Sequence, residues 1–261
     1  MARSITVLRS LGACCALLLA LAVLLPATAG AQDALTVVTE PASIRMGTQY
    51  DGIDLKITGN VPAGSDVVVR FTGAPAKLHL RRKGKVFGLL WMNVGKVTVD
   101  NVPKVCLVDS SAPYTQLAPA AESYRLEGLR DDMKIEEGAD SADLDIVHEL
   151  LLLKESEGLY SENAGGVVLG PDEGGSRTFS ATLPVPSALS PSDYVVQVMA
   201  LRDGAVIGTA STPIHAELVG FPAWLSHMAF DNALLYGILA TVIAILSGLA
   251  IGMIFQSKGA H

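Results

Sequence analysis

Apolar and polar residues alternate along much of the segment 32–109. Ile53, Leu55 and Ile57 are separated by polar neighbours, and the run that begins at Val67 repeats the pattern. Residues two apart share one face of a strand, so this period predicts strands with one buried face. Gly and Pro residues separate the runs at turn-like intervals. Several short strands in this order are typical of an antiparallel β-sandwich.

The pattern changes in an insert at about 115–160. Long runs there lack Gly and Pro, and apolar residues such as Leu151 recur at helical spacing among charged neighbours. Three- and four-residue intervals place these side chains on one helical face. We expect two helices, at 121–134 and 143–158, with Gly158 placed to end the second.

The strand pattern returns at Arg177. Tyr194 begins a later strand after a Pro-containing connection, which is the setting of the tyrosine corner in Ig-like sandwiches. Asp203-Gly204 is a two-residue hairpin signal. Because strands flank the insert on both sides, one interrupted domain is favoured over two. The fold class expected is therefore mainly β: an Ig-like antiparallel sandwich ectodomain over 32–220, with a helical insertion and one C-terminal transmembrane helix.

The first residues have the layout of a signal peptide. Arginines precede an apolar run from Leu11 to Leu25, and Ala29-Gly30-Ala31 follows as a cleavage site. We expect residues 1–31 to be removed on export. The folded part would then lie in the periplasm of a bacterial cell.

A second long apolar segment lies near the other end. Residues 233–255 carry no charge, and a helix of that length spans about 34 Å, against about 30 Å for a bilayer core. This predicts one transmembrane helix in the bacterial inner membrane, preceded by an interfacial segment at 221–232. Lys258 follows the helix, so the positive-inside rule favours a cytoplasmic tail at 256–261.

Charge is distributed unevenly over the ectodomain. Residues 122–173 contain four Lys or Arg and fifteen Asp or Glu, whereas the net charge of the whole chain is only −7. A solvated helix surface explains this acidity. The alternative is that the acidic insert docks near the basic cluster described next.

The cations cluster before and after Gly84, which predicts that they lie at the tip of a hairpin. They are Arg81, Arg82, Lys83 and Lys85. Such a cluster can bind an anion, an acidic partner surface or anionic lipid headgroups, or can simply be solvated. Trp91 follows on the next strand, where we expect core packing.

The apolar helix has small residues at every fourth position. They are Ala240, Ala244, Gly248 and Gly252. Small residues on one face allow another helix to approach closely, so this face is a candidate contact with another membrane protein or a second copy. The alternative is that Gly and Ala are simply common in membrane helices.

Catalytic and metal-binding motifs are absent from the sequence. The histidines have no ligand spacing, and no nucleophile or phosphate-loop motif occurs. Cys106 lies in an apolar run and is expected to be a small buried residue. We therefore expect no enzyme activity, no metal, no cofactor and no nucleic-acid partner.

With these segments placed, the chain resembles a family of alphaproteobacterial-type transmembrane proteins of unknown function. The stretches that carry the resemblance are Gly64-Ser65-Asp66-Val67-Val68-Val69, Arg81-Arg82-Lys83, Gly88-Leu89-Leu90-Trp91-Met92-Asn93, Asn101-Val102-Pro103, Ser110-Ser111, Gly165-Gly166-Val167, 179–186 with Asp193-Tyr194, and Leu234-Leu235-Tyr236-Gly237. The resemblance implies an architecture of signal, ectodomain and single helix. It also implies association with a sulfite-exporter-like permease. The segment from Lys104 to Leu107 departs from the family pattern, so the family lends no role to Cys106.

These observations favour a non-enzymatic, membrane-anchored protein that acts by protein interaction, as an accessory to such an anion permease. The first alternative is a periplasmic module that binds a small anion. The second is an enzyme with an unrecognised site, for which a pocket with two or more titratable side chains would argue.

Overall fold

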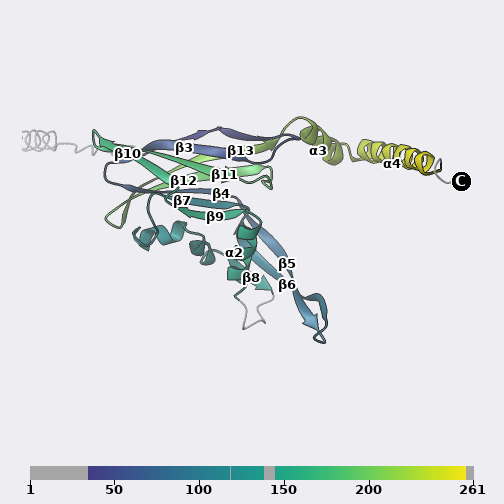
Figure 1. Ribbon diagram of the computed structural model, residues 1–261, viewed down its shortest axis with the longest axis horizontal. Helices are drawn as coiled ribbons and strands as arrows, with labels where there is room; N and C mark the ends of the chain where they lie inside the picture. Colours follow the sequence, from purple (N-terminus) through teal and green to yellow (C-terminus); the bar gives the residue numbers. More distant parts are fainter. Residues whose placement is uncertain (1–34, 118, 138–144, 257–261) are drawn as a thin grey trace, which may run out of the picture. The chain divides into compact units, whose positions relative to one another are not determined.

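Strands dominate the part of the chain that the structure describes, which comprises residues 35–117, 119–137 and 145–256 of a computed structural model (Figure 1). The expected signal peptide and nearly all of the expected tail lie outside the described residues. The strands are β1 Thr36–Glu40, β2 Ser43–Met46, β3 Ile53–Pro62, β4 Asp66–Gly73, β5 Pro75–Val86, β6 Leu90–Pro103, β7 Cys106–Ser110, β8 Lys134–Glu137, β9 Tyr160–Ala164, β10 Val167–Glu173, β11 Ser176–Val185, β12 Ser192–Arg202 and β13 Ala205–Leu218. The mainly-β prediction is confirmed.

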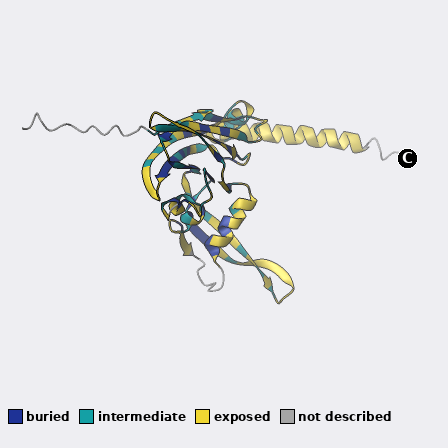
Figure 2. Ribbon diagram, turned by 60° about the vertical axis from the view of Figure 1, so that its left-hand side comes forward, coloured by how far each residue is buried: buried dark blue, intermediate teal, exposed yellow. Residues whose placement is uncertain are grey.

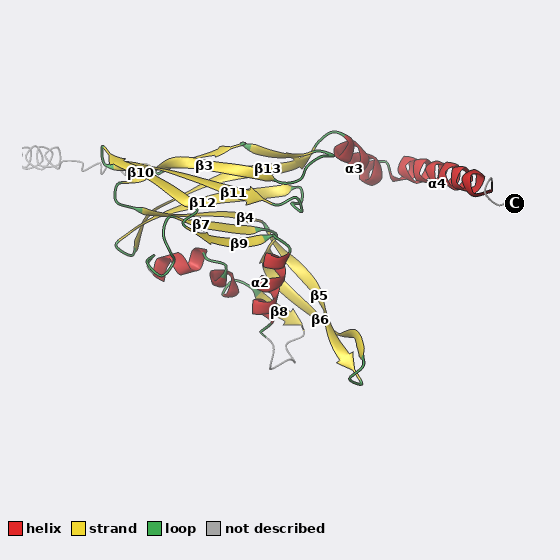
Figure 3. Ribbon diagram, viewed as in Figure 1, coloured by secondary structure: helices red, strands yellow, loops and turns green. Residues whose placement is uncertain are grey.

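Helices account for a smaller share of the described chain (Figure 3). They are α2 Ile146–Ser156, α3 Phe221–Asp231 and α4 Ala233–Gln256, with two 3₁₀ helices, η1 Pro119–Tyr124 and η2 Glu127–Arg130. Residues 233–255 of α4 form a helix long and apolar enough to cross a membrane, as the sequence predicts.

Two of the sheets pack face to face. The four-stranded sheet has the order β1-β3-β11-β10, and the six-stranded sheet has the order β2-β13-β12-β4-β7-β9. Most neighbours are antiparallel, but β2 runs parallel to β13 and β9 runs parallel to β7. The expectation of a wholly antiparallel sandwich was therefore wrong at these two pairs. β2 and β9 are the outer strands of the six-stranded sheet, and each pairs with a neighbour on one side only.

The core between these sheets contains the predicted alternating residues. Leu55 and Ile57 of β3 face Val69 and Phe71 of β4 across it, and all four are buried. Tyr194 of β12 is also buried, and its ring stacks on Phe71 with centroids 5.1 Å apart. Stacked aromatic pairs add to the stabilisation from buried area alone.

Tyr194 forms the tyrosine corner that its position suggests. Its hydroxyl donates a hydrogen bond of 2.7 Å to the backbone carbonyl of Ser190, four residues earlier. The bond joins the start of β12 to the loop before it and satisfies a polar group at the edge of the core. The Asp203-Gly204 turn between β12 and β13 is also confirmed, with φ of 48° and 84° at its two residues. Positive φ at both central positions is the type I′ geometry of a tight hairpin.

The six-stranded sheet is buried on its second face as well (Figure 2). Val68 points opposite to Val67 and Val69, yet all three are buried, and every residue of β7 is buried. A second core covers this face, formed by α2, η1, η2 and the base of the β5–β6 hairpin. The hairpin pairs with β8 in a separate three-stranded sheet of order β5-β6-β8.

The insert is more compact than its sequence pattern predicts. The helix expected at 121–134 is wrong: the chain forms η1 and η2 there and then enters β8. Gly128 explains the fold-back, because a Cβ at that position would lie 2.4 Å from the Glu122 carbonyl oxygen. Leu126, Leu129 and Met133 all reach the second core through these short turns. These three residues also have the spacing i, i+3, i+7 of one helical face, which is why the sequence pattern predicts a helix here.

The second expected helix is confirmed in shortened form as α2. Asp145 caps it, with its carboxylate accepting from the His148 backbone N–H at 3.1 Å. Gly158, with φ of 69°, follows its last turn as predicted. The strands β9 and β10, between α2 and Arg177, were not predicted. The partner of β9 is β7, more than fifty residues earlier, so the local pattern gave a weak signal for it. β10 forms a hairpin with its neighbour β11, closed at Gly174-Gly175.

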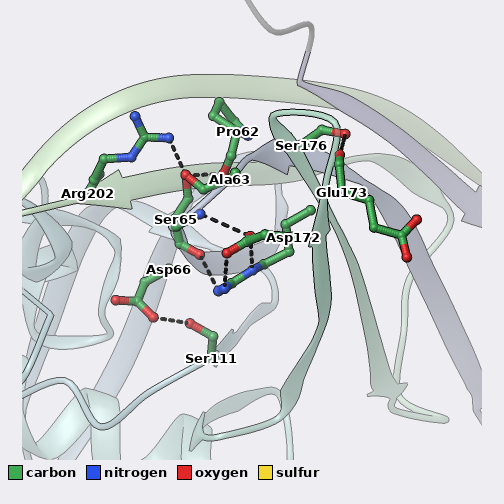
Figure 4. A network of polar contacts seen from close by, with 11 residues as sticks. Pro62, Ala63, Ser65, Asp66, Ser111, Asp172, Glu173, Ser176 and Arg202 are labelled. Atoms are coloured by element: carbon green, nitrogen blue, oxygen red, sulfur yellow. Dashed lines mark hydrogen bonds and ion pairs between the residues drawn. The ribbon is translucent and has the colours of Figure 1, made fainter.

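Polar contacts join the two sheets of the sandwich at one end (Figure 4). The Asp172 carboxylate of β10 accepts from Arg177 at 2.7 Å and from the Gly64 backbone N–H at 3.1 Å. The Ser111 hydroxyl after β7 donates to Asp66 at 3.0 Å and accepts from the Val67 N–H. The hydrogen bond from Arg177 lowers the pKa of Asp172. This network fixes the β3–β4 turn, where Gly64 has φ of 70°.

Substitution of Tyr194 by Phe tests the tyrosine corner. The change removes the hydroxyl but keeps the ring against Phe71, so the Ser190 carbonyl loses its donor. We expect the free energy of unfolding to fall by about 1–2 kcal/mol. Chemical denaturation of the protein in mild detergent measures this. Tyr124→Phe, at a half-buried tyrosine of η1, is the control and should change stability by less than about 0.5 kcal/mol.

Candidate functional site

The predicted basic cluster lies on a projecting part of the β5–β6 hairpin. Residues 81–96, here called the arm, extend beyond the part of the hairpin that α2 and β8 cover (Figure 1). Arg81 pairs with Lys96 at the base of the arm, and Val86 pairs with Leu90 at its end. The two strands remain hydrogen-bonded to each other beyond the elements that form the second core.

The turn of the hairpin lies at Val86–Leu89. Phe87 and Gly88 have φ of 54° and 73°, and the Leu89 N–H donates to the Val86 carbonyl at 3.3 Å. This is again the two-residue I′ geometry, with the unusual feature that one positive φ belongs to Phe. The turn predicted at Gly84 is wrong. Gly84 lies within β5, where a Cβ would come within 2.8 Å of the Val94 side chain.

The four predicted cations consequently lie along the flank of the arm and not at its tip. Arg81, Lys83 and Lys85 alternate along one face of β5, whereas Arg82 lies on the other. Across the ladder, Lys96 pairs with Arg81 and Trp91 pairs with Lys85, so they share the first face. Lys85 Nζ lies 5.4 Å from the Trp91 ring centroid, a cation–π contact.

Large apolar side chains are exposed at the tip. Phe87 is 94% exposed, Leu89 84%, Trp91 67% and Leu90 63%. The expectation that Trp91 packs in the core was wrong, because the arm extends past every element that could cover it. Met92 and Val94 continue the exposed apolar surface on the face opposite to Arg81, Lys83 and Lys85. Contiguous exposed apolar groups of this size mark interaction sites.

The cations of the arm have no acidic partner within 35–117, 119–137 and 145–256. The printed sequence has no Asp or Glu between Leu78 and Val99. Two described acids beside the hairpin and η1 pair with other cations: Glu136 binds Lys77 at 2.7 Å, and Glu162 binds Arg125 at 2.8 Å. The insert thus docks beside the base of the hairpin, but its described acids leave the four predicted cations free.

A groove runs between the base of the arm and α2. It has a volume of about 280 Å³ and is lined by Leu80, Arg81, Arg82, Val97, Ile146, Glu149, Leu150 and Leu153. The groove is the place where the second core opens to solvent and continues into the apolar face of the arm. It adds apolar surface to the arm on one side only.

The predicted small-residue face of α4 is open in the described chain. A Cβ at Gly248 or Gly252 would meet no atom within 4 Å. The apolar, membrane-length stretch of α4 is not buried against any other described part of the chain. Ala244 and Ala240 lie one and two turns before Gly248 on the same face of α4. This face therefore remains a predicted packing surface, and the structure adds no contact to it.

A cleft of about 520 Å³ gathers titratable groups that sequence reasoning did not connect. His215 and Asp193 are direct neighbours on β13 and β12, with Nδ1 and Oδ1 2.7 Å apart, and His227 pairs with Asp231 on α3. The register of the Asp203-Gly204 turn alone would place Asp193 opposite Ile214, and an irregularity between Ala200 and Leu201 brings His215 opposite it instead. Both pairs are largely exposed, and neither serine of the lining, Ser192 or Ser226, bonds to a histidine among the described residues. The nucleophile–base geometry of hydrolases is not formed there.

The most perturbed carboxyl group lies in the body of the sandwich. Asp109 of β7 is only 3% exposed, and burial raises its pKa from the ordinary 3.8 to about 6, partly offset by a hydrogen bond from Asn163. Gly166 allows this burial, since a Cβ there would lie 2.3 Å from Asp109 Oδ2. The close approach explains why a glycine is needed beside β7.

Cys106 is fully buried at the start of β7, as predicted. Burial raises the pKa of its thiol to about 12. The thiolate, which is the reactive form, is therefore negligibly populated at neutral pH. Cys106 is a packing residue of the second core.

Within the described residues, a β-rich domain joined to one apolar helix of membrane-spanning length defines a transmembrane protein. The chain belongs to the family described as "Putative transmembrane protein (Alph_Pro_TM)", whose model matches residues 34–257. The resemblance stated from the sequence is thereby confirmed, and the family has no established function. A search of curated proteins finds no match.

Thiol titration checks the burial of Cys106. Because the thiol is buried and its pKa is raised, we expect no reaction with a maleimide at pH 7.4 in the native protein. The denatured mature protein should react with one equivalent. The unprocessed chain contains three cysteines, so three equivalents would show that residues 1–31 remain attached.

Asp109 should make stability depend on pH. Its folded-state pKa lies above the unfolded value, so its contribution is fully present below about pH 4 and is lost as pH rises through about 6. A shift of about two units corresponds to roughly 3 kcal/mol. We expect Asp109→Asn to stabilise the protein by about 1–3 kcal/mol at pH 8 and to leave it unchanged at pH 4.

Denaturation curves across this pH range measure the effect. Asp54→Asn, at an exposed carboxylate of β3, is the matched control and should leave the pH profile of the wild type intact. A wild-type profile that is flat between pH 4 and 7 would contradict the burial of an ionisable Asp109.

Proposed function

We propose that this protein is a non-enzymatic, membrane-anchored envelope protein that acts by binding other components of the membrane in which it lies. The observation that carries the proposal is the arm. It presents five large apolar side chains more than half exposed, directly beside cations that have no acidic partner among the described residues. Such an exposed apolar surface lowers solubility, and on natural proteins it marks a site of contact with a partner.

The orientation proposed is an ectodomain in the periplasm and a cytoplasmic C-terminus, in the bacterial inner membrane. The signal-like sequence at 1–31 and the position of Lys258 after the apolar helix support it. α3 supports the boundary as well, because it begins with Phe221-Pro222 and contains Trp224, residues suited to an interface.

The partner protein that we propose is a sulfite-exporter-like anion permease, to which this chain is an accessory. The permease contact would be the face of α4 with Ala240, Ala244, Gly248 and Gly252. Support comes from the open space beside the two glycines, which permits close approach of another helix. Self-association of α4 through the same face is the competing arrangement.

The arrangement of the cations favours binding to an extended anionic surface over binding of a small anion. Arg81, Lys83 and Lys85 follow one another along a strand, so their Cα atoms are spaced about 6.6 Å apart in a row. A small anion is held by groups that converge on it. A row of cations instead matches an extended anionic surface.

Purification of the tagged full chain in mild detergent tests the proposed function. We expect a stoichiometric membrane protein to copurify with the wild type and to be lost with Gly248→Leu and Gly252→Leu together, because leucines prevent close helix approach. Ala250→Leu, which enlarges a small residue on the opposite face of α4, is the matched control and should retain the partner.

Absence of any copurifying protein, with the wild-type chain stable in detergent, would contradict the accessory role. Calorimetry of the full chain with sulfite, sulfate and phosphate addresses the anion-binding alternative. Under the proposed function it gives no heat of binding.

A further inference from the structure

The apolar side chains of the arm surround its tip on both faces. Trp91 lies on the cationic face of the two-stranded ribbon, whereas Leu90 and Met92 lie on the opposite face, and Phe87 and Leu89 flank the turn. A rigid protein surface covers one face of such a ribbon and leaves the other in water. A fluid apolar medium covers both.

The cations are ordered behind the apolar tip. Lys85 lies two residues from Phe87, with Lys83 and Arg81 following at two-residue intervals, which places them about 7–20 Å behind the turn. A headgroup layer is about 5–8 Å deep on each side of the hydrocarbon. The order of apolar and then cationic side chains along the arm therefore matches the order of hydrocarbon and headgroup layers at a bilayer surface.

The identity of the residues also fits a lipid boundary. Trp91 is at the level of the first cation, Lys85, and lies under its charge at 5.4 Å. Tryptophan favours the interface between headgroups and acyl chains. With no carboxylate between Leu78 and Val99, nothing on the arm repels an anionic surface, and cations near such a surface are attracted to it.

The backbone limits the depth of insertion. A hairpin of two strands leaves unpaired N–H and C=O groups along both outer edges, and these groups cannot be buried in hydrocarbon without large cost. Only the turn and its apolar side chains can enter beyond the headgroups. The contact would be shallow and reversible, which is sufficient for a protein that α4 already holds at the membrane.

We propose that the tip of the arm, with Phe87, Leu89, Leu90 and Trp91, inserts into the interfacial layer of an anionic phospholipid bilayer, with Lys85 and Lys83 against the lipid phosphates and Arg81 in the water just beyond them. This inference rests on the proposed function, because it names the membrane component that the arm contacts. The protein partner at α4 is a separate contact.

The fluorescence of Trp91 tests this directly. The chain has two tryptophans, so Trp224→Phe leaves Trp91 as its only one. The full-length Trp224→Phe protein is reconstituted into liposomes of phosphatidylcholine alone or with added phosphatidylglycerol. With the anionic lipid, we expect the emission of Trp91 to shift to shorter wavelength and its quenching by acrylamide to fall about twofold. High salt should reverse much of the change.

Two further variants separate the contributions. Lys83→Glu with Lys85→Glu should abolish the dependence on anionic lipid, while Lys56→Glu, at an exposed lysine of β3, should leave it unchanged. Phe87→Ser with Leu89→Ser should abolish the wavelength shift in all liposomes. Circular dichroism and unfolding curves confirm that each variant is folded.

Trp91 emission and quenching that are the same with and without phosphatidylglycerol would overturn the inference. The proposed function is judged separately, by copurification. If Trp91 stays water-exposed and the protein partner is lost with Phe87→Ser and Leu89→Ser, the arm is a protein-binding site. In that case the proposed function stands and the lipid contact is refuted.

Discussion

The structure depends on one constraint: the six-stranded sheet is apolar on both faces and must be covered twice. Val67 and Val69 face one layer and Val68 faces the other, and all residues of β7 are buried. Each fully buried aliphatic side chain contributes about 1.5–3 kcal/mol, so leaving either face in water would remove much of the stability of the domain. The four-stranded sheet covers the first face. The insert and the base of the β5–β6 hairpin cover the second.

This second cover determines where the arm lies. α2 spans only the lower part of the hairpin, where Leu80 and Val97 meet Ile146 and Leu150 at the edge of the second core. Past that point the ribbon continues with the same alternation but without a covering layer. The apolar side chains of the tip are therefore exposed because the hairpin is longer than the layer that protects it. Its exposed length contributes no packing to the core.

Polar contacts lie near the ends of the sandwich, and two of them depend on a glycine. The Gly64 turn is held by Asp172 and Arg177, and Gly166 gives room for the Asp109 carboxylate. Of these positions, Gly64 and Gly166 fall in stretches that carry the resemblance to the family. Their role is explained by close backbone approach and hydrogen bonding. The arm stretch from Gly88 to Asn93 also carries the resemblance, but packing does not explain its exposed aromatic and aliphatic residues.

The sequence by itself determined the membrane helix, the mainly-β class, the central strands and the tight turn at Asp203-Gly204, because each follows from contacts between residues close in the chain. It also indicated the tyrosine corner and the burial of Cys106. Only the tertiary structure decided the parallel pairs β2–β13 and β7–β9, the compact turns that replace a helix at 121–134, and the exposure of Trp91. An alternating strand has the same pattern whether its apolar face is covered or not. Coverage comes from layers distant in the sequence, and for the arm those layers end before the strands do.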